Sequence, residues 1–175
     1  MSADEVGEPS PDGPRAGVED RLAFVVLPAL ALALGAAAGY LTWQNSYHRA
    51  ATIAAKDSVV VARETATAML SYNADTVEKD LNSARDRLTG SFLDEYTKLV
   101  NEVVIPGSRE KNISAVAQVP ATASVSATPD HAVALVFVNQ TVTVGKDTPT
   151  NTASSVRVSL DRVGGQWLVS GFEPV

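Results

Sequence analysis

Cysteine is absent from the 175 residues, and histidine occurs only twice. Without cysteine the chain has no disulfide, no thiolate nucleophile and no zinc-thiolate site. This absence leaves the compartment open, because a domain without disulfides functions on either side of a membrane. Basic residues are also few, with 14 Lys+Arg against 20 Asp+Glu and a formal net charge of -6. No basic surface is available to neutralise phosphates, so we exclude nucleic acid as a partner.

Charged residues are missing from a 20-residue apolar run between Leu22 and Leu41. As a helix rising about 1.5 Å per residue, this run matches the roughly 30 Å hydrocarbon core of a bilayer. Tyr40 and Trp43 lie at its end, where aromatic rings favour the headgroup level. We therefore predict a transmembrane helix at residues 22–43 and the lipid bilayer as a partner.

A cleavable signal peptide is the alternative for this run, with Ala36-Ala37-Ala38 as its cleavage site. Signal-peptide cores span about 7–15 residues, so the longer run favours a retained anchor. The basic residues near its two ends encode orientation only weakly. Because the folded part follows the span, we expect a single-pass protein of the plasma membrane with an extracytoplasmic C-terminal domain. Gly35 and Gly39 form a GxxxG pattern for helix–helix packing, or a chance pattern in an alanine-rich span.

Composition and period divide the rest of the chain. Residues 1–20 combine three prolines with six acidic residues and almost no large apolar side chain, which predicts a disordered acidic tail. Residues 44–110 have helical periodicity, and residues 111–175 alternate with a period of two. Helices followed by strands indicate the α+β class. The sequence therefore predicts one domain, in which a helical half packs on a curved four-stranded antiparallel sheet, after a single N-terminal transmembrane helix.

Three helices are predicted in the helical half. The first continues from the span to about Tyr72. Asp75 opens the second, with Glu78 as its capping-box partner three residues later. The third begins near Ser91. Pro106-Gly107 ends it, because proline removes a donor and glycine permits positive φ.

Four strands are predicted in the sheet half. Residues 113–128 alternate between apolar and mostly polar, which predicts one long strand with Pro120 at a bulge or an edge. Residues 132–138 are continuously apolar, as in a strand buried on both faces. Residues 145–154 are polar and are predicted as a loop. Val156, Val158 and Leu160 mark the third strand, and a Gly164-Gly165 turn leads to the fourth.

Groups that could carry chemistry are scarce. His48 follows the span, where an interfacial position explains it, and His131 follows Asp130 in a predicted turn, which favours solvated surface. No metal-ligand spacing or phosphate-binding loop occurs. Trp167 is expected in the core, with the lining of a ligand cavity as the alternative. We therefore assign no catalytic, cofactor-binding or metal-binding residue and no cofactor, and we predict that the chain is not an enzyme.

Several segments in order give the chain a family resemblance between residues 50 and 175. They are Leu70-Ser71-Tyr72-Asn73, Leu88-Thr89-Gly90-Ser91-Phe92 with Tyr96, residues 126–133 leading into Phe137-Val138-Asn139-Gln140-Thr141, Val156-Arg157-Val158, Gly165-Gln166-Trp167-Leu168-Val169 and Glu173-Pro174-Val175. Through these segments the chain resembles the Mce-associated membrane proteins of mycobacteria and related actinobacteria. None of them is a catalytic signature, so the resemblance rests on their number and order.

The resemblance implies an accessory protein that stabilises or assembles an Mce-type lipid-import transporter, with the transporter subunits as partners. It also implies a cone-shaped fold of the nuclear transport factor and SnoaL type, similar to an inner-membrane scaffold component of type IV secretion. Two alternatives stay open. One is a cone that binds a lipid in a dry pocket of several hundred Å³. The other is a SnoaL-like enzyme, which requires a buried His, Asp or Glu facing a cavity.

Overall fold

The computed structural model describes residues 18–175, except for the side chains of residues 18–31, 33, 41 and 43–48. Residues 1–17 of the predicted acidic tail (residues 1–20) lie outside the described part of the chain. The chain divides into two units, and we call the second, Ser46–Val175, the head. Helix α1 (Val18–Leu70) includes residues of both units. The predicted transmembrane helix at residues 22–43 falls within α1, but most of its side chains, those of residues 22–31, 33, 41 and 43, lie outside the described part of the chain. Among the described residues, no helix is both long and apolar enough to cross a membrane.

Three more α-helices and one π-helix follow α1. They are α2 (Val77–Arg85), α3 (Gly90–Leu99), the π-helix η1 (Val100–Val104) and α4 (Ile105–Lys111). The prediction that Pro106-Gly107 ends the third helix is wrong. Pro106 lies in the first turn of α4, where its missing N–H costs little. The helical region ends instead at Asn112, which adopts the left-handed conformation with φ 52°.

The predicted capping box at the start of α2 is also wrong. Thr76 is the N-cap residue and makes no side-chain capping bond. The carboxylate of Asp80, one turn into the helix, accepts hydrogen bonds from the Thr76 hydroxyl at 2.7 Å and the Asn73 amide at 3.2 Å. Glu78 pairs with Arg109 at 2.6 Å. Asp80 thus performs the role that the sequence motif gave to Glu78.

The sheet is a four-stranded antiparallel meander, as predicted. Its strands β1 (Ile113–Ala127), β2 (His131–Val144), β3 (Thr150–Val163) and β4 (Gln166–Pro174) lie in the order β1-β2-β3-β4. The register of β1 shifts between Gln118 and Ala121, so Pro120 lies at a bulge on an edge strand. Gly164 and Gly165 have φ values of 59° and 85°, as a tight hairpin turn requires.

Two details of the strands differ from the sequence predictions. Residues 132–138 are not buried on both faces, because only Ala132, Ala134, Val136 and Val138 are buried while Phe137 is 41% exposed. The predicted loop at residues 145–154 is shorter, because β3 begins at Thr150. Its polar first residues pair with β2 from Thr150 opposite Val142 to Ser154 opposite Val138. Backbone pairing therefore extends the strand where the side chains give no apolar signal.

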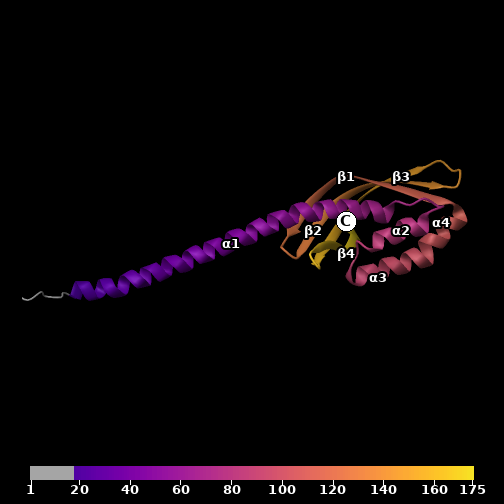
Figure 1. Cartoon of the computed structure of the whole chain (residues 1–175). Helices are drawn as coiled ribbons and strands as arrows, with labels where there is room; N and C mark the ends of the chain where they lie inside the picture. Colours follow the sequence, from indigo (N-terminus) through magenta and orange to yellow (C-terminus); the bar gives the residue numbers. More distant parts are fainter. Residues whose placement is uncertain (1–17) are drawn as a thin grey trace, which may run out of the picture. The chain divides into compact units, whose positions relative to one another are not determined.

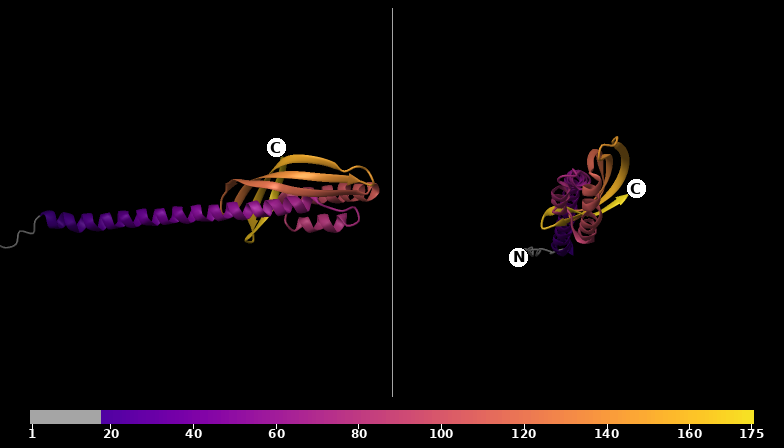
Figure 2. Two further views of the ribbon diagram at one scale, coloured as in Figure 1. Left: turned by 90° about the horizontal axis from the view of Figure 1, so that it is seen from above. Right: turned by 90° about the vertical axis from the view of Figure 1, so that its right-hand side faces the viewer.

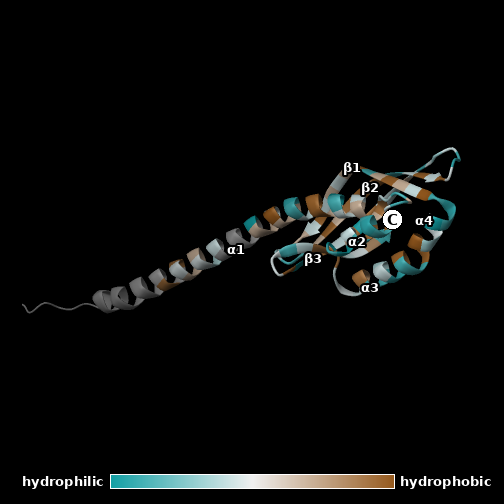
Figure 3. Cartoon of the chain, turned by 45° about the vertical axis from the view of Figure 1, so that its right-hand side comes forward, coloured by the Kyte–Doolittle hydropathy of each residue, from teal (hydrophilic) through white to brown (hydrophobic). Residues whose placement is uncertain are grey.

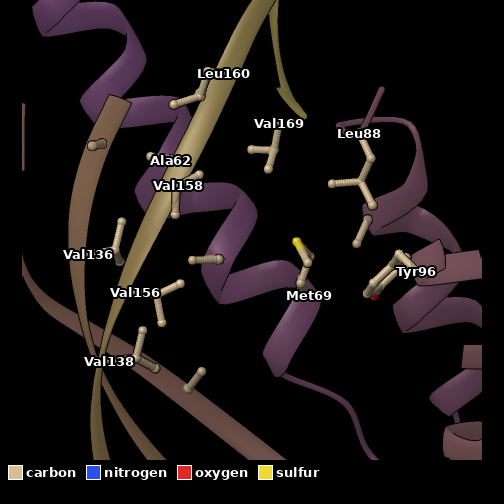
Figure 4. Close-up of a cluster of buried hydrophobic side chains, with 14 of the residues drawn as sticks. Ala62, Met69, Leu88, Tyr96, Val136, Val138, Val156, Val158, Leu160 and Val169 are labelled. Carbon is tan, nitrogen blue, oxygen red and sulfur yellow. The ribbon is translucent and has the colours of Figure 1, made fainter. Parts of the chain in front are cut away.

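The core of the head lies between one face of the sheet and the helices. Figures 1 and 2 show the C-terminal half of α1 together with α2 and α3 on the same side of the sheet. Small residues form most of the buried face of α1, which lets the helix approach the sheet closely: Ala54, Ser58, Ala62, Thr65, Ala66 and Met69. Figure 4 shows Val136, Val156 and Val158 on the strands facing α1, and Met69 lying towards the helix that carries Tyr96.

Both edge strands are bound by segments that connect the helices. Tyr72 and Ala115 exchange two backbone hydrogen bonds, of 2.8 and 2.9 Å, at the β1 edge. At the β4 edge, Val169 accepts a 2.9 Å hydrogen bond from the Thr89 amide and donates one of 2.9 Å to the Arg87 carbonyl. The sheet is therefore fastened on both sides to the helical half of the head.

Candidate functional site

An apolar cavity of about 450 Å³ lies in the head, where α1 ends against α2, α3, η1 and the sheet. This volume falls in the range of about 300–1,000 Å³ that is usual for small-molecule sites. All of the residues around it belong to the head: Met69, Leu70, Tyr72, Leu81, Phe92, Glu95, Tyr96, Leu99, Val100, Val104, Gln140 and Phe172. The cavity is the candidate site, and its existence agrees with the pocket expected for a ligand-binding cone.

Aromatic and aliphatic side chains supply most of the wall. The rings of Phe92 and Phe172 stack with centroids 6.4 Å apart, which joins α3 to β4. Tyr96 lies 6.4 Å from the same Phe92 ring and is buried. Leu99, one turn after Glu95, is 54% exposed, so apolar surface continues from the cavity to the outside.

The π-helix η1 shapes one side of the cavity. Val100 and Val104, its first and last residues, both line the cavity. Together with Tyr96 they form a row at spacings of four residues that α3 and η1 share. Single-turn π-helices occur often at functional sites, because the extra residue widens the turn and reorients side chains.

Two polar side chains of the wall are tied to the backbone. The Gln140 amide donates a 3.1 Å hydrogen bond to the Leu70 carbonyl at the end of α1. The Tyr96 hydroxyl donates to the Leu81 carbonyl at 3.5 Å, and burial raises the pKa of the Tyr96 phenol despite the opposing charge of Arg85. Both residues thus fix helix positions around the cavity.

The other two polar side chains of the wall, those of Tyr72 and Glu95, are not tied to the backbone in the described part of the chain. Burial also raises the pKa of the Tyr72 phenol, and its hydroxyl has no hydrogen-bond partner in the described part of the chain. Glu95 is exposed. Tyr72 therefore contributes to the wall a neutral phenol that is partly exposed and whose hydroxyl is available to a ligand or to water.

The residues discussed from sequence lie elsewhere. His131 is half exposed and its Nδ1 lies 2.6 Å from Asp161 Oδ1, on the side of the sheet away from the core. Trp167 is 8% exposed and packs in the core, as expected, with Arg162 stacked 5.8 Å from its ring centroid. The side chain of His48 lies outside the described residues. In the described part of the chain, no group of three or more His, Asp or Glu could hold a metal ion.

The enzyme hypothesis set a structural condition, a buried His, Asp or Glu that faces a cavity. Glu95 is the acidic residue in the cavity wall, and it is exposed. The condition is therefore not met at this cavity, and the absence of enzymatic activity stays a prediction. Sequence analysis missed Tyr72 and Gln140 as site residues, because Gln140 reaches the end of α1 only after folding, through a bond between positions 70 residues apart.

Relatives from mycobacteria match most of the chain. The outer membrane protein Rv1973 of Mycobacterium tuberculosis is 58% identical over 154 residues, which cover 88% of this chain and 96% of the relative. The uncharacterized protein Rv1362c of the same organism is 38% identical over 155 residues, which cover 86% of this chain and 70% of the relative.

Solved structures show a related fold. An IcmL-like type IV secretion system protein from Legionella pneumophila matches with a TM-score of 0.58 and 12% identity, covering 67% of this chain and 88% of that one. The VirB8 protein of Agrobacterium tumefaciens matches with a TM-score of 0.53 and 16% identity, covering 66% and 88%. At such identities the likeness concerns the fold alone, and it confirms the expected similarity to a type IV secretion component.

The comparisons correct the family that the sequence segments suggested. The resemblance to Mce-associated membrane proteins is wrong, because the family model that matches is another one and the structural neighbours are secretion-system domains. None of the segments that suggested it is a catalytic signature, so they could not by themselves distinguish one family from another. The model described as "Uncharacterized protein Rv1363c/MT1408-like" covers residues 20–175, and the chain therefore belongs to the Rv1363c/MT1408-like family.

Proposed function

We propose that the chain is a non-enzymatic scaffold of the cell envelope. Residues 22–43 hold it in a bilayer, and the head binds protein partners outside the cytoplasm. The observation that carries the proposal is the extent of α1, a single helix that contains the uncharged run and also supplies the buried face that packs against the sheet.

Two likenesses support this proposal. The relative at 58% identity is named an outer membrane protein, and one neighbour in fold is the periplasmic domain of DotI, with a TM-score of 0.58. The apolar cavity supplies no acid–base pair, so binding rather than catalysis is the function that the geometry favours. Gly35 and Gly39 give α1 a GxxxG pattern, which would let a second anchor helix approach closely.

The experiment is protease protection and carbonate extraction of the full chain in intact spheroplasts. External protease should remove the head, and carbonate should leave the chain in the membrane fraction. The double variant Leu32→Arg/Ala36→Arg places two charges in the apolar run, at a cost of about 5–7 kcal/mol in lipid. It should release the chain from the membrane.

The matched control is Ile53→Arg/Val60→Arg, which places the same charges at exposed positions of α1 in the head. It should stay in the membrane fraction. Native electrophoresis in mild detergent should show the wild-type chain in an assembly larger than itself. A chain that carbonate extracts, or that migrates alone under these conditions, would contradict the scaffold.

A further inference from the structure

Two residues of the cavity wall, Phe172 and Gln140, lie far apart along the strands. Phe172 lies opposite Val158 on β3, and Val158 lies opposite Ala134 on β2. Gln140 is six residues further along β2, which is about 20 Å at roughly 3.3 Å per residue. The aromatic end of the cavity at Phe172 and the polar end at Gln140 are thus far apart. A long, narrow molecule fits this space better than a compact one.

The polar end has a defined hydrogen-bonding character. The Gln140 side chain must point its NH₂ group at the Leu70 carbonyl, because a carbonyl oxygen only accepts. This assignment leaves the Gln140 carbonyl oxygen as an acceptor. Tyr72 lies nearby, since it pairs with Ala115, and Gln140 lies opposite Ala117 on the same strand β1. Its free hydroxyl donates or accepts, so the pair matches a group that does both, such as an alcohol.

The charge of the wall discriminates against anions. Lys, Arg and His are absent from the residues that line the cavity, and Glu95 is the charged residue among them. A carboxylate ligand would lose its hydration without gaining a cation, and it would lie in the same cavity as the Glu95 carboxylate. A neutral hydroxyl compound of the same length avoids both costs.

From size, shape, hydrogen bonding and charge together, we propose that the cavity binds a neutral, long-chain apolar molecule with one terminal hydroxyl group and excludes the corresponding carboxylate. The hydroxyl lies between Tyr72 and Gln140, and the apolar chain runs past Leu99 and Val100 towards Phe92 and Phe172. Leu99, exposed at the opening, provides the entry surface. This binding is independent of the scaffold role and of the membrane anchor.

The test is photocrosslinking of the full chain in mild detergent with two probes. One is hexadecanol with a diazirine in its chain, and the other is hexadecanoic acid with the same diazirine. The alcohol should label peptides that contain the wall of the cavity, which are those with residues 69–72, residues 92–104, Gln140 or Phe172. Labelling by the acid should be about tenfold weaker, a difference of about 1.4 kcal/mol. Excess unlabelled hexadecanol should compete.

Matched variants locate the site. Val104→Trp fills the cavity and should reduce labelling by the alcohol about tenfold, whereas Val103→Trp, at an exposed position outside the wall, should not. Glu95→Lys supplies the missing cation and should raise labelling by the acid. Glu102→Lys makes the same charge change on an exposed residue outside the wall and should have no effect.

Tyr72→Phe keeps the ring and removes the hydroxyl, so it should reduce the preference for the alcohol without changing the melting temperature. This variant and Glu95→Lys preserve the test if Val104→Trp fails to fold. Equal labelling by the two probes, labelling that Val104→Trp leaves unchanged, or crosslinks only at residues outside the cavity wall would overturn the proposal.

Discussion

The side-chain amide of Gln140 on β2 donates a 3.1 Å hydrogen bond to the carbonyl oxygen of Leu70, the last residue of α1. This bond satisfies one of the four carbonyls that a helix leaves without an internal partner at its C-terminal end. It also fixes where α1 ends against the sheet. The cavity therefore depends on a contact between the two halves of the head.

Replacing Gln140 by Leu should lower the free energy of unfolding by about 1–3 kcal/mol, because the partly buried Leu70 carbonyl loses its partner. Gln118→Leu, at an exposed position of β1, should change it by less than about 0.5 kcal/mol. Urea unfolding of the two variants measures the difference. Equal effects would show that the amide contributes nothing specific.

The start of α2 should depend on Asp80 more than on Glu78. Asp80→Ala removes two hydrogen bonds, to Thr76 and Asn73, and should cost about 0.5–2 kcal/mol, as for other residues that fix a helix N-terminus. Glu78→Ala removes an exposed ion pair with Arg109, which is worth about 0.2–1 kcal/mol. Thermal unfolding of both variants gives the order. A larger loss for Glu78→Ala would show that its ion pair with Arg109 matters more to α2 than the hydrogen bonds of Asp80.

The contact between Asp161 and His131 should make the free energy of unfolding depend on pH in the acidic range. A hydrogen bond with His131 is the main cause that holds the pKa of the Asp161 carboxyl below its ordinary value. A hydrogen bond with Ser170 lowers this pKa further, and burial opposes both. A lowered pKa in the folded state contributes stability that is complete above the unfolded pKa, about 3.9, and is lost as the pH falls through the folded value.

The free-energy advantage of the wild type over Asp161→Asn should therefore be steady above about pH 5 and shrink towards about pH 2. Urea unfolding at several pH values measures it. Asp147→Asn, at an exposed position with no side-chain hydrogen bond in the described part of the chain, is the comparison and should show a smaller change with pH. An advantage for Asp161 that stays constant to pH 2 would contradict the assignment.

Two glycines should respond to alanine with opposite signs. Gly107 lies inside α4, where a Cβ meets no atom within 4 Å, so Gly107→Ala should raise the free energy of unfolding by about 0.4–1 kcal/mol. Gly165 has φ 85° in the β3–β4 turn, so Gly165→Ala should lower it by about 1–2 kcal/mol. Melting temperatures of the two variants, compared with wild type, are the measurement.

The order of helices and strands could be predicted because periodicity reports directly on burial. The bulge at Pro120, the turn at Gly164-Gly165 and the buried Trp167 follow from local chemistry in the same way. Figure 3 shows this periodicity in α3, along which apolar and hydrophilic residues follow one another at short intervals. Local rules failed where two of them compete, as at Pro106, which stops a helix in its middle and is tolerated in its first turn.

The candidate site could not be predicted because its parts meet only after folding. Tyr72, Glu95 and Gln140 come from a connecting segment, a helix and a strand, and no spacing in the sequence links them. The start of β3 escaped detection for a similar reason. Thr150 and the polar residues after it form a strand because β2 offers backbone partners, and pairing of this kind leaves no mark on hydropathy.

The backbone hydrogen bonds between Tyr72 and Ala115 and between Thr89 and Val169 bear on how copies of the head can associate. An edge strand with unpaired backbone groups can pair with a strand of another molecule, and repeated pairing of this kind leads to aggregation. Here each margin is partly occupied by the molecule's own chain. At these two positions a strand from a second copy of the head could pair only after displacing the molecule's own segment.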